Sequence, residues 1–143
     1  MIHTPVIGGY ITSHFEEKRM FNGKEIIHGG LDIGRKEHPC KIYNTHNGIV
    51  HASGWSETYG WRVWVKVKND LFIVYGHLES ISENAKLIGT KINAGDEIGI
   101  MGNTGYSKGV HLHYGWSTMP TVNGKKLKPI EIENMLIQNI VKI

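Results

Sequence analysis

The chain has 143 residues, of which 40% are hydrophobic and 20% charged, so it can bury a core and does not belong to the disordered class. Its 16 basic and 13 acidic residues give a formal charge of +3, which suits an anionic partner without indicating nucleic acid. The single cysteine, Cys40, excludes an internal disulfide, and no apolar run is long enough to span a membrane. We therefore predict one domain over residues 1–143, with no membrane insertion and no nucleic-acid partner.

A β-hairpin is predicted in the middle of the chain. The segment WRVWVKVK (61–68) alternates apolar and polar residues, as a strand with one buried face does. Asn69-Asp70 then predicts a turn into a second strand, LFIVYGHL (71–78). The alternation assigns the first strand two faces: Val63, Val65 and Val67 on one, and Arg62, Trp64, Lys66 and Lys68 on the other.

Turn signals divide the rest of the chain into short segments, a pattern typical of β-sandwiches and barrels. A helix is predicted only at the C-terminus, where Pro129 suits the first turn. An apolar stripe at helical spacing follows it, formed by Ile132, Met135, Leu136 and Ile140. The turn signals are NG at 47–48, NAGD at 93–96, GNTG at 102–105 and NG at 123–124.

The chain contains nine histidines, which is too many for all of them to be ligands. Five lie in polar or glycine-containing segments without a partner at ligand spacing. We interpret these five as surface or hydrogen-bonded side chains: His3, His14, His38, His46 and His51.

The segment GVHLHYG (109–115) places two histidines at positions i and i+2. On a strand, such side chains share a face, with Cα atoms roughly 7 Å apart. His111 and His113 are therefore predicted to face one site. Leu112 and Tyr114 are predicted to face the core. An isolated pair of this kind also fits a solvent-exposed face, so the motif needs a second set of ligands.

The segment HGGLD (28–32) supplies that second set. His28 and Asp32 stand four positions apart, and two glycines within a helix would each cost about 1 kcal/mol relative to alanine. On an extended segment the two side chains share a face instead. Imidazole and carboxylate are the ligand types of a catalytic zinc site, in which three protein ligands leave a position for water. The spacing does not decide which members of the two motifs bind the metal.

Four segments in order resemble the motifs of the lysostaphin-like, LytM-type zinc endopeptidases (family M23), which cleave peptide bonds in peptidoglycan. The resemblance covers about residues 10–130, and it includes glycine-bearing turns like those of the family's duplicated β-sandwich. It implies a mainly β, antiparallel, sandwich- or barrel-like fold of duplicated hybrid motifs with an open substrate groove and a short C-terminal helix. The four segments are ITSHFEEKR (11–19), HGGLDIG (28–34), VYGHL (74–78) and GVHLHYG (109–115).

The resemblance also implies roles for single residues. His28, Asp32 and His113 are expected to bind Zn²⁺, and His77 and His111 to form a catalytic pair that does not bind it. His111 is the expected proton acceptor because it neighbours a ligand, and His77 would stabilise the oxyanion or orient the water. The sequence leaves these two roles interchangeable. The family's substrate-positioning tyrosine has four candidates here: Tyr10, Tyr43, Tyr59 and Tyr106.

These motifs predict a zinc metalloendopeptidase that hydrolyses stem or cross-bridge peptides of peptidoglycan. It would act at the bacterial cell wall, as a monomer or as part of a larger assembly. The alternatives are an inactive wall-binding or regulatory module of the same fold, a zinc enzyme with a closed pocket for a small molecule, and a structural zinc domain. All five expected site positions are filled, which favours the enzyme. The sequence does not indicate which peptide bond is cleaved.

The N-terminal segment MIHTPVIGGYITSH has neither the basic region nor the uninterrupted apolar region of a secretory signal. We therefore expect delivery to the wall by another route. The expected routes are a phage lysin, a virion-associated hydrolase or a domain excised from a longer protein.

Overall fold

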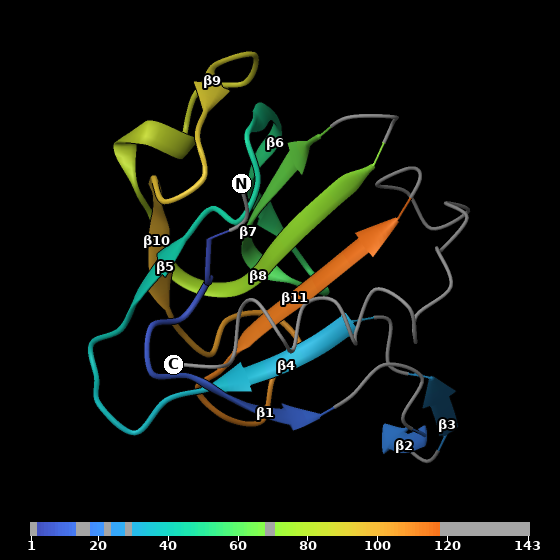
Figure 1. Cartoon of the computed structure of the whole chain (residues 1–143). Helices are drawn as coiled ribbons and strands as arrows, with labels where there is room; N and C mark the ends of the chain where they lie inside the picture. The colour runs from blue at the N-terminus through green and yellow to red at the C-terminus, as the bar shows by residue number, and fades with distance from the viewer. Residues whose placement is uncertain (1–2, 14–17, 22–23, 28–29, 68–70, 118–143) are drawn as a thin grey trace.

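The computed structural model describes residues 3–13, 18–21, 24–27, 30–67 and 71–117 (Figure 1). These residues form antiparallel strands and one short 3-10 helix, η2 (Glu83–Ala85), which confirms the predicted mainly β fold. The C-terminal helix predicted from Pro129 lies outside the described residues, and the single domain over 1–143 stays a prediction. The strands are β1 (Tyr10–Ser13), β2 (Lys18–Phe21), β3 (Lys24–Ile27), β4 (Gly30–Gly34), β5 (Lys41–Tyr43), β6 (Gly48–Ser56), β7 (Gly60–Lys66), β8 (Phe72–Ile81), β9 (Lys91–Ile92), β10 (Glu97–Met101) and β11 (Leu112–Ser117).

One large sheet contains all of these strands except β2 and β3, which pair with each other. Its main path runs β1-β4-β11-β8-β7-β6-β9, and β10 joins β8 to β5 beside this path. The sheet does not close on itself, because β1 and β9 stand at its two ends (Figure 1). No helix among the described residues is long and apolar enough to cross a membrane.

Strand β8 changes its partner partway along its length. Residues 72–76 pair with β11, whereas residues from Leu78 onward pair with β10. His77 lies at the change of partner and has a positive φ of 61°, which is unusual for a residue other than glycine. The connection from β10 to β11 therefore begins and ends beside His77, where Gly102 and His111 pair with each other.

The predicted hairpin is present as β7 and β8, which pair antiparallel. Val63 and Val65 are fully buried in the main core, as the alternation predicts. The opposite face is also partly covered, because Trp64 packs with Phe72 and Val74 in a second apolar cluster. This second cluster lies on the face that carries the candidate site.

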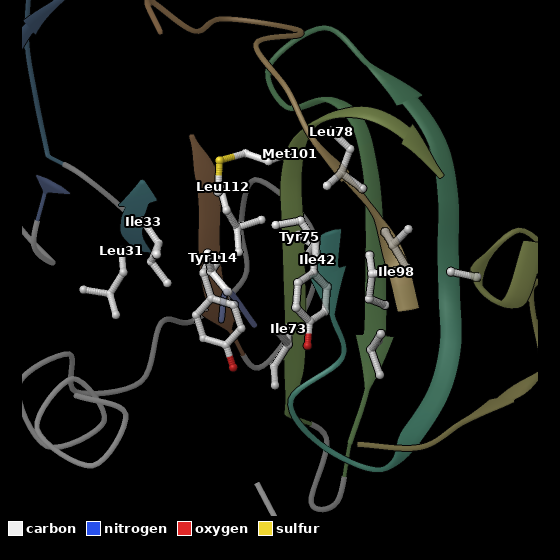
Figure 2. Close-up of a cluster of buried hydrophobic side chains, with 14 of the residues drawn as sticks. Leu31, Ile33, Ile42, Ile73, Tyr75, Leu78, Ile98, Met101, Leu112 and Tyr114 are labelled. Atoms are coloured by element: carbon white, nitrogen blue, oxygen red, sulfur yellow. The ribbon is translucent and has the colours of Figure 1, made fainter. Parts of the chain in front are cut away.

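The main core lies beneath the other face of the large sheet (Figure 2). Strands β4 and β11 contribute every second side chain to it, which is the two-residue period of a strand with one buried face. Strand β8 contributes Ile73, Tyr75 and then Leu78, because its alternation shifts by one residue at His77. The labelled core residues in Figure 2 are Leu31, Ile33, Ile42, Ile73, Tyr75, Leu78, Ile98, Met101, Leu112 and Tyr114.

Two tyrosine hydroxyls are satisfied within this core. Thr45 Oγ1 lies 2.7 Å from the Tyr114 hydroxyl and 3.0 Å from that of Tyr75. The Tyr75 hydroxyl also accepts a hydrogen bond from the Thr45 amide and donates one to the Asn44 side chain. Burial raises the pKa of both phenols, so the hydroxyls stay protonated and able to donate.

Candidate metal and catalytic site

Asp32 and His113 lie side by side on neighbouring strands. Asp32 is in β4, His113 is in β11, and the two residues are direct partners in the register. Their chain neighbours Leu31, Ile33 and Leu112 enter the core, so the alternation of the strands turns the carboxylate and the imidazole to the opposite face. Asp32 Oδ1 lies 3.3 Å from His113 Nδ1, and both side chains are buried.

His111 approaches the same carboxylate from the end of the loop that precedes β11. Its Nε2 lies 3.4 Å from Asp32 Oδ1, and its Nδ1 lies 2.8 Å from the Gly109 carbonyl oxygen. Because a carbonyl only accepts, Nδ1 is the nitrogen that carries the hydrogen. The two histidines of the HLH motif thus flank one carboxylate oxygen.

The spacing of these atoms suits ligands of a shared zinc ion. With zinc–ligand distances of about 2.0–2.2 Å and tetrahedral angles, two ligand atoms stand roughly 3.3–3.5 Å apart. The Asp32–His113 and Asp32–His111 separations of 3.3 and 3.4 Å both match that value, so distance alone does not choose between the two histidines. Within the described residues, no group of three or more candidate ligands is arranged to hold a metal ion. The predicted third ligand, His28, lies outside them.

The close approach of β4 to β11 requires one of the two glycines in the HGGLD segment, Gly30. A Cβ at this position would lie 2.6 Å from the Tyr114 carbonyl oxygen and 3.0 Å from the His113 ring. Real Cβ atoms do not approach this closely, so glycine lets β4 pack directly against β11 at the site. The glycine therefore makes room for the histidine of the neighbouring strand.

The ring of His77 faces the two histidines of β11. Its centroid lies 4.9 Å from that of His111 and 5.9 Å from that of His113. The change of partner in β8 puts the positive φ at this residue, and its amide donates to the Tyr59 carbonyl at 2.6 Å. The VYGHL motif thus delivers its histidine to the same place as HLH.

Thr104 fixes the orientation of His77. Its carbonyl oxygen lies 2.6 Å from His77 Nδ1. Its hydroxyl donates to the Leu78 carbonyl at 2.6 Å and accepts from the Trp61 amide at 3.1 Å. One residue therefore ties the imidazole, the strand β8 and the start of β7 together.

Burial keeps His77 neutral, and its hydrogen bond to Thr104 fixes the tautomer. The Thr104 carbonyl accepts a hydrogen from Nδ1, so the lone pair of Nε2 is the available proton acceptor. Burial, followed by the positive charge that His113 can carry, lowers the pKa of His77 to about 4, although the Thr104 carbonyl opposes this shift. His77 is therefore uncharged at neutral pH.

Two glycines let the tip of the β6–β7 hairpin lock against the loop after β10. Gly60 and Gly105 both have positive φ, and a Cβ on either would collide with the other segment. The Tyr106 amide also donates to the Thr58 carbonyl at 3.0 Å. The GNTG segment lies in the loop between β10 and β11, and its close packing against the β6–β7 hairpin holds the Thr104 carbonyl in place.

A hollow of about 450 Å³ opens to the surface above these side chains. Of the four candidate tyrosines, Tyr106 lines it. Tyr59 lies beneath, with its ring centroid 5.3 Å from that of His113. The other lining residues are Thr12, Asp32, His77, Ser107, Lys108, Gly109, Val110, His111 and His113. Four of the five predicted site residues therefore meet here. Tyr59 was among the candidate tyrosines, whereas sequence reasoning missed the contribution of Thr104.

Replacing Thr104 by valine should lower both stability and turnover. Valine keeps the carbonyl and the branched shape but loses both hydroxyl hydrogen bonds, each worth about 1 kcal/mol. Thr104→Ser keeps the hydroxyl and should restore most of the loss. The measurements are the free energy of unfolding in denaturant and kcat for each variant. Equal kcat values for the valine and serine variants would contradict a positioning role.

The fold and the hollow define a class of β proteins that gather carboxylate and imidazole side chains at an open surface. The family model described as "Peptidase family M23" matches residues 26–129. The chain belongs to this family, which confirms the resemblance seen in its motifs.

Individual relatives agree with this assignment. An L-Ala–D-Glu endopeptidase of Bacillus subtilis is 30% identical over 72% of this chain and 33% of its own length. The catalytic domain of EnpA, a prophage-encoded M23 protein of Enterococcus faecalis, is 27% identical, with a TM-score of 0.71 over 89% of this chain and 95% of that one. A zinc-containing peptidase of Vibrio cholerae is 26% identical, with a TM-score of 0.64 over 75% of this chain and 32% of that one. The chain spans about a third or less of the curated relatives it matches.

Proposed function

We propose that the chain is a zinc-dependent endopeptidase that hydrolyses peptide bonds of bacterial peptidoglycan. One observation carries the proposal: Asp32, His77, His111 and His113 line one open hollow in a chain of the M23 family. The endopeptidase activity of the Bacillus relative and the zinc of the Vibrio neighbour support the substrate class and the cofactor. The hollow opens to the surface, as a polymeric substrate requires.

Zinc would be held by His28, Asp32 and His113. The described pair fits the ion in donor chemistry and in separation. When bound, zinc polarises the scissile carbonyl and lowers the pKa of its water towards about 7. Both His111 and His113 lie near the same carboxylate oxygen, so distance does not choose between them. The family resemblance selects His113 as the histidine of the HLH motif that binds the ion.

The surroundings of the two remaining histidines favour exchanging the roles first expected for them. Both rings hold their hydrogen on Nδ1 against a backbone carbonyl, but Nε2 of His111 lies 3.4 Å from Asp32 Oδ1. His77 holds its hydrogen on Nδ1 and keeps the Nε2 lone pair towards the hollow, so its geometry allows it to take a proton from the attacking water. The new C–O bond forms in this attack, and His77 then passes the proton to the leaving amine nitrogen as the C–N bond breaks. His111, whose Nε2 lies beside Asp32, orients the water by accepting a hydrogen bond from it, and it donates to the developing oxyanion only when its ring is protonated.

Defined peptidoglycans offer the direct test of the proposed reaction. The protein is incubated with them in the presence and absence of a chelator, and released fragments are identified by mass spectrometry. We expect fragments with new amino and carboxyl ends, their loss in the chelator and their return with added zinc. Wall binding without fragments would instead identify an inactive module, and fragments that persist in the chelator would exclude zinc dependence. Delivery by phage stays a prediction, which the prophage origin of the EnpA neighbour supports.

Acid should remove zinc and activity together. Imidazole ligands bind metal only when neutral, so with an ordinary histidine pKa of about 6.5 both quantities should fall below about pH 6. The pKa of His77, about 4, lies too low to account for a loss of activity below about pH 6. Since folded His77 binds fewer protons than it does in the unfolded chain, the folded state also loses stability as pH falls from about 6.5 towards 4. Zinc content and hydrolysis measured from about pH 8 to 4 check this, and full activity at about pH 4 would contradict it.

A further inference from the structure

A second hollow, of about 380 Å³, lies next to the candidate active site and shares no lining residue with it. Its walls come from β6, the start of β7, the end of β8 and the segment after η2. The lining residues are Ser53, Gly54, Trp61, Glu79, Ser80, Ile81 and Lys86.

Two tryptophans form an exposed aromatic surface at this hollow. Trp61 lines it, and Trp55 is its partner across the β6–β7 pair, with ring centroids 5.4 Å apart in an edge-to-face arrangement. The side chains are 40% and 54% exposed, respectively. Large exposed aromatic surfaces with a polar rim mark binding sites on soluble proteins. The amide of Trp61 is held by Thr104, so the backbone of this surface is fixed.

The chemistry of the hollow fits a sugar ring better than an apolar protein surface. A pyranose presents C–H groups on its face, which stack on an aromatic ring, and hydroxyl groups around its edge. Glu79 has no hydrogen-bond or ion-pair partner within the described part of the chain, and with Ser53 and Ser80 it offers polar groups for such an edge. An apolar partner would instead desolvate Glu79 and Lys86 without compensation. The volume lies near the low end of small-ligand sites.

The position of the hollow relates it to the candidate active site. Glu79 follows His77 by two residues on β8, which places their Cα atoms roughly 7 Å apart. Thr104 contacts both walls, through the imidazole of His77 and the amide of Trp61. In peptidoglycan the stem peptide is covalently attached to a sugar of the glycan strand. A stem peptide bound over His77 near its sugar-bearing end therefore places that sugar within reach of Trp61.

We propose that the Trp61 hollow is a subsite for an N-acetylated pyranose of the glycan strand, with Trp55 extending its aromatic surface. This inference rests on the proposed peptidoglycan substrate. The subsite makes glycan-attached peptides better substrates than the same peptides released from sugar.

Calorimetric titration with a peptide-free tetramer of β-1,4-linked N-acetylglucosamine tests the subsite without any turnover. The wild-type protein should bind the sugar saturably, and Trp61→Ala should weaken binding by roughly tenfold or more. Trp61→Phe keeps a ring and should retain most of the affinity. Ile49→Ala is the matched control, because this exposed apolar residue on β6 lies outside both hollows and should leave binding unchanged.

A second measurement compares kcat/KM on one stem peptide with and without its attached sugars. The preference for the sugar-bearing form should fall by roughly tenfold in Trp61→Ala. Absence of saturable binding by the wild type, or equal binding by Trp61→Ala and wild type, would overturn the subsite. Self-association that Trp61→Ala abolishes, in place of sugar binding, would assign the surface to a second copy of the chain. Sugar binding without hydrolysis would contradict the proposed function and leave the subsite standing.

Discussion

Replacing His77 by asparagine should lower kcat by about 10²–10⁴-fold, the usual contribution of a positioned proton-transfer group. The imidazole is held by the Thr104 carbonyl and faces the hollow, but it is not among the expected zinc ligands. Bound zinc should therefore stay at the wild-type level. Steady-state hydrolysis of a defined peptidoglycan fragment and metal analysis of the purified variant measure the two quantities.

The choice of substitution matters because His77 has a positive φ of 61°. Asparagine tolerates this conformation and glycine adopts it freely, whereas alanine would add backbone strain to the loss of the ring. His77→Gly should thus resemble His77→Asn in kcat. His51→Asn is a matched control, because this exposed histidine packs on Phe72 and lies outside the catalytic hollow. Loss of zinc from both His77 variants would show that this residue binds the metal and would reject its assigned role.

Replacing Asp32 by alanine should eliminate bound zinc and hydrolysis together. Its carboxylate lies between two imidazoles and supplies the only negative ligand in the proposed set. Zinc should fall from about one ion per chain to a trace, because the two remaining ligands do not suffice for a catalytic site. A metal present at a hundred times its dissociation constant stabilises the folded state by about 2.7 kcal/mol, so chelator should lower the Tm of the wild type but not that of the variant.

His111→Ala and His113→Ala together test which histidine of the HLH motif binds zinc, because the distances to Asp32 do not decide this. If His113 is the ligand, His111→Ala keeps its zinc and loses turnover, whereas His113→Ala loses both. Metal analysis of the two variants decides the point. Stoichiometric loss of zinc from His111→Ala would reverse the assignment of the HLH motif.

The parts of this site that follow strand periodicity could be predicted from the sequence. A two-residue alternation suffices to place His111 and His113 on one face, and it places Asp32 on the matching face of β4. The alternation in residues 61–68 likewise predicts the hairpin and its buried valines. Such patterns are visible because one face of each strand is buried.

The position of His77 and its support depend on contacts between distant segments. The sequence gives no sign that β8 changes partner at this residue, because a positive φ at a histidine has no local signature. The Thr104 carbonyl acts through backbone, so its role does not depend on the identity of a side chain. Gly60 and Gly105 can be recognised as turn residues, but their mutual close approach is a tertiary property. His28 was predicted as a ligand and lies outside the described residues.

The buried tyrosine hydroxyls have a consequence for the opposite surface of the sheet. Tyr114 follows His113 directly, and its hydroxyl is bound to Thr45 deep in the core. A slip of β11 by one position would drive an imidazole into that polar pocket and expose a phenol in place of His113. The hydrogen bonds of these buried hydroxyl groups therefore favour the correct register of β11, from the face of the sheet opposite the hollow. Selection on the candidate site would therefore act on the buried side of the sheet as well as on its exposed side.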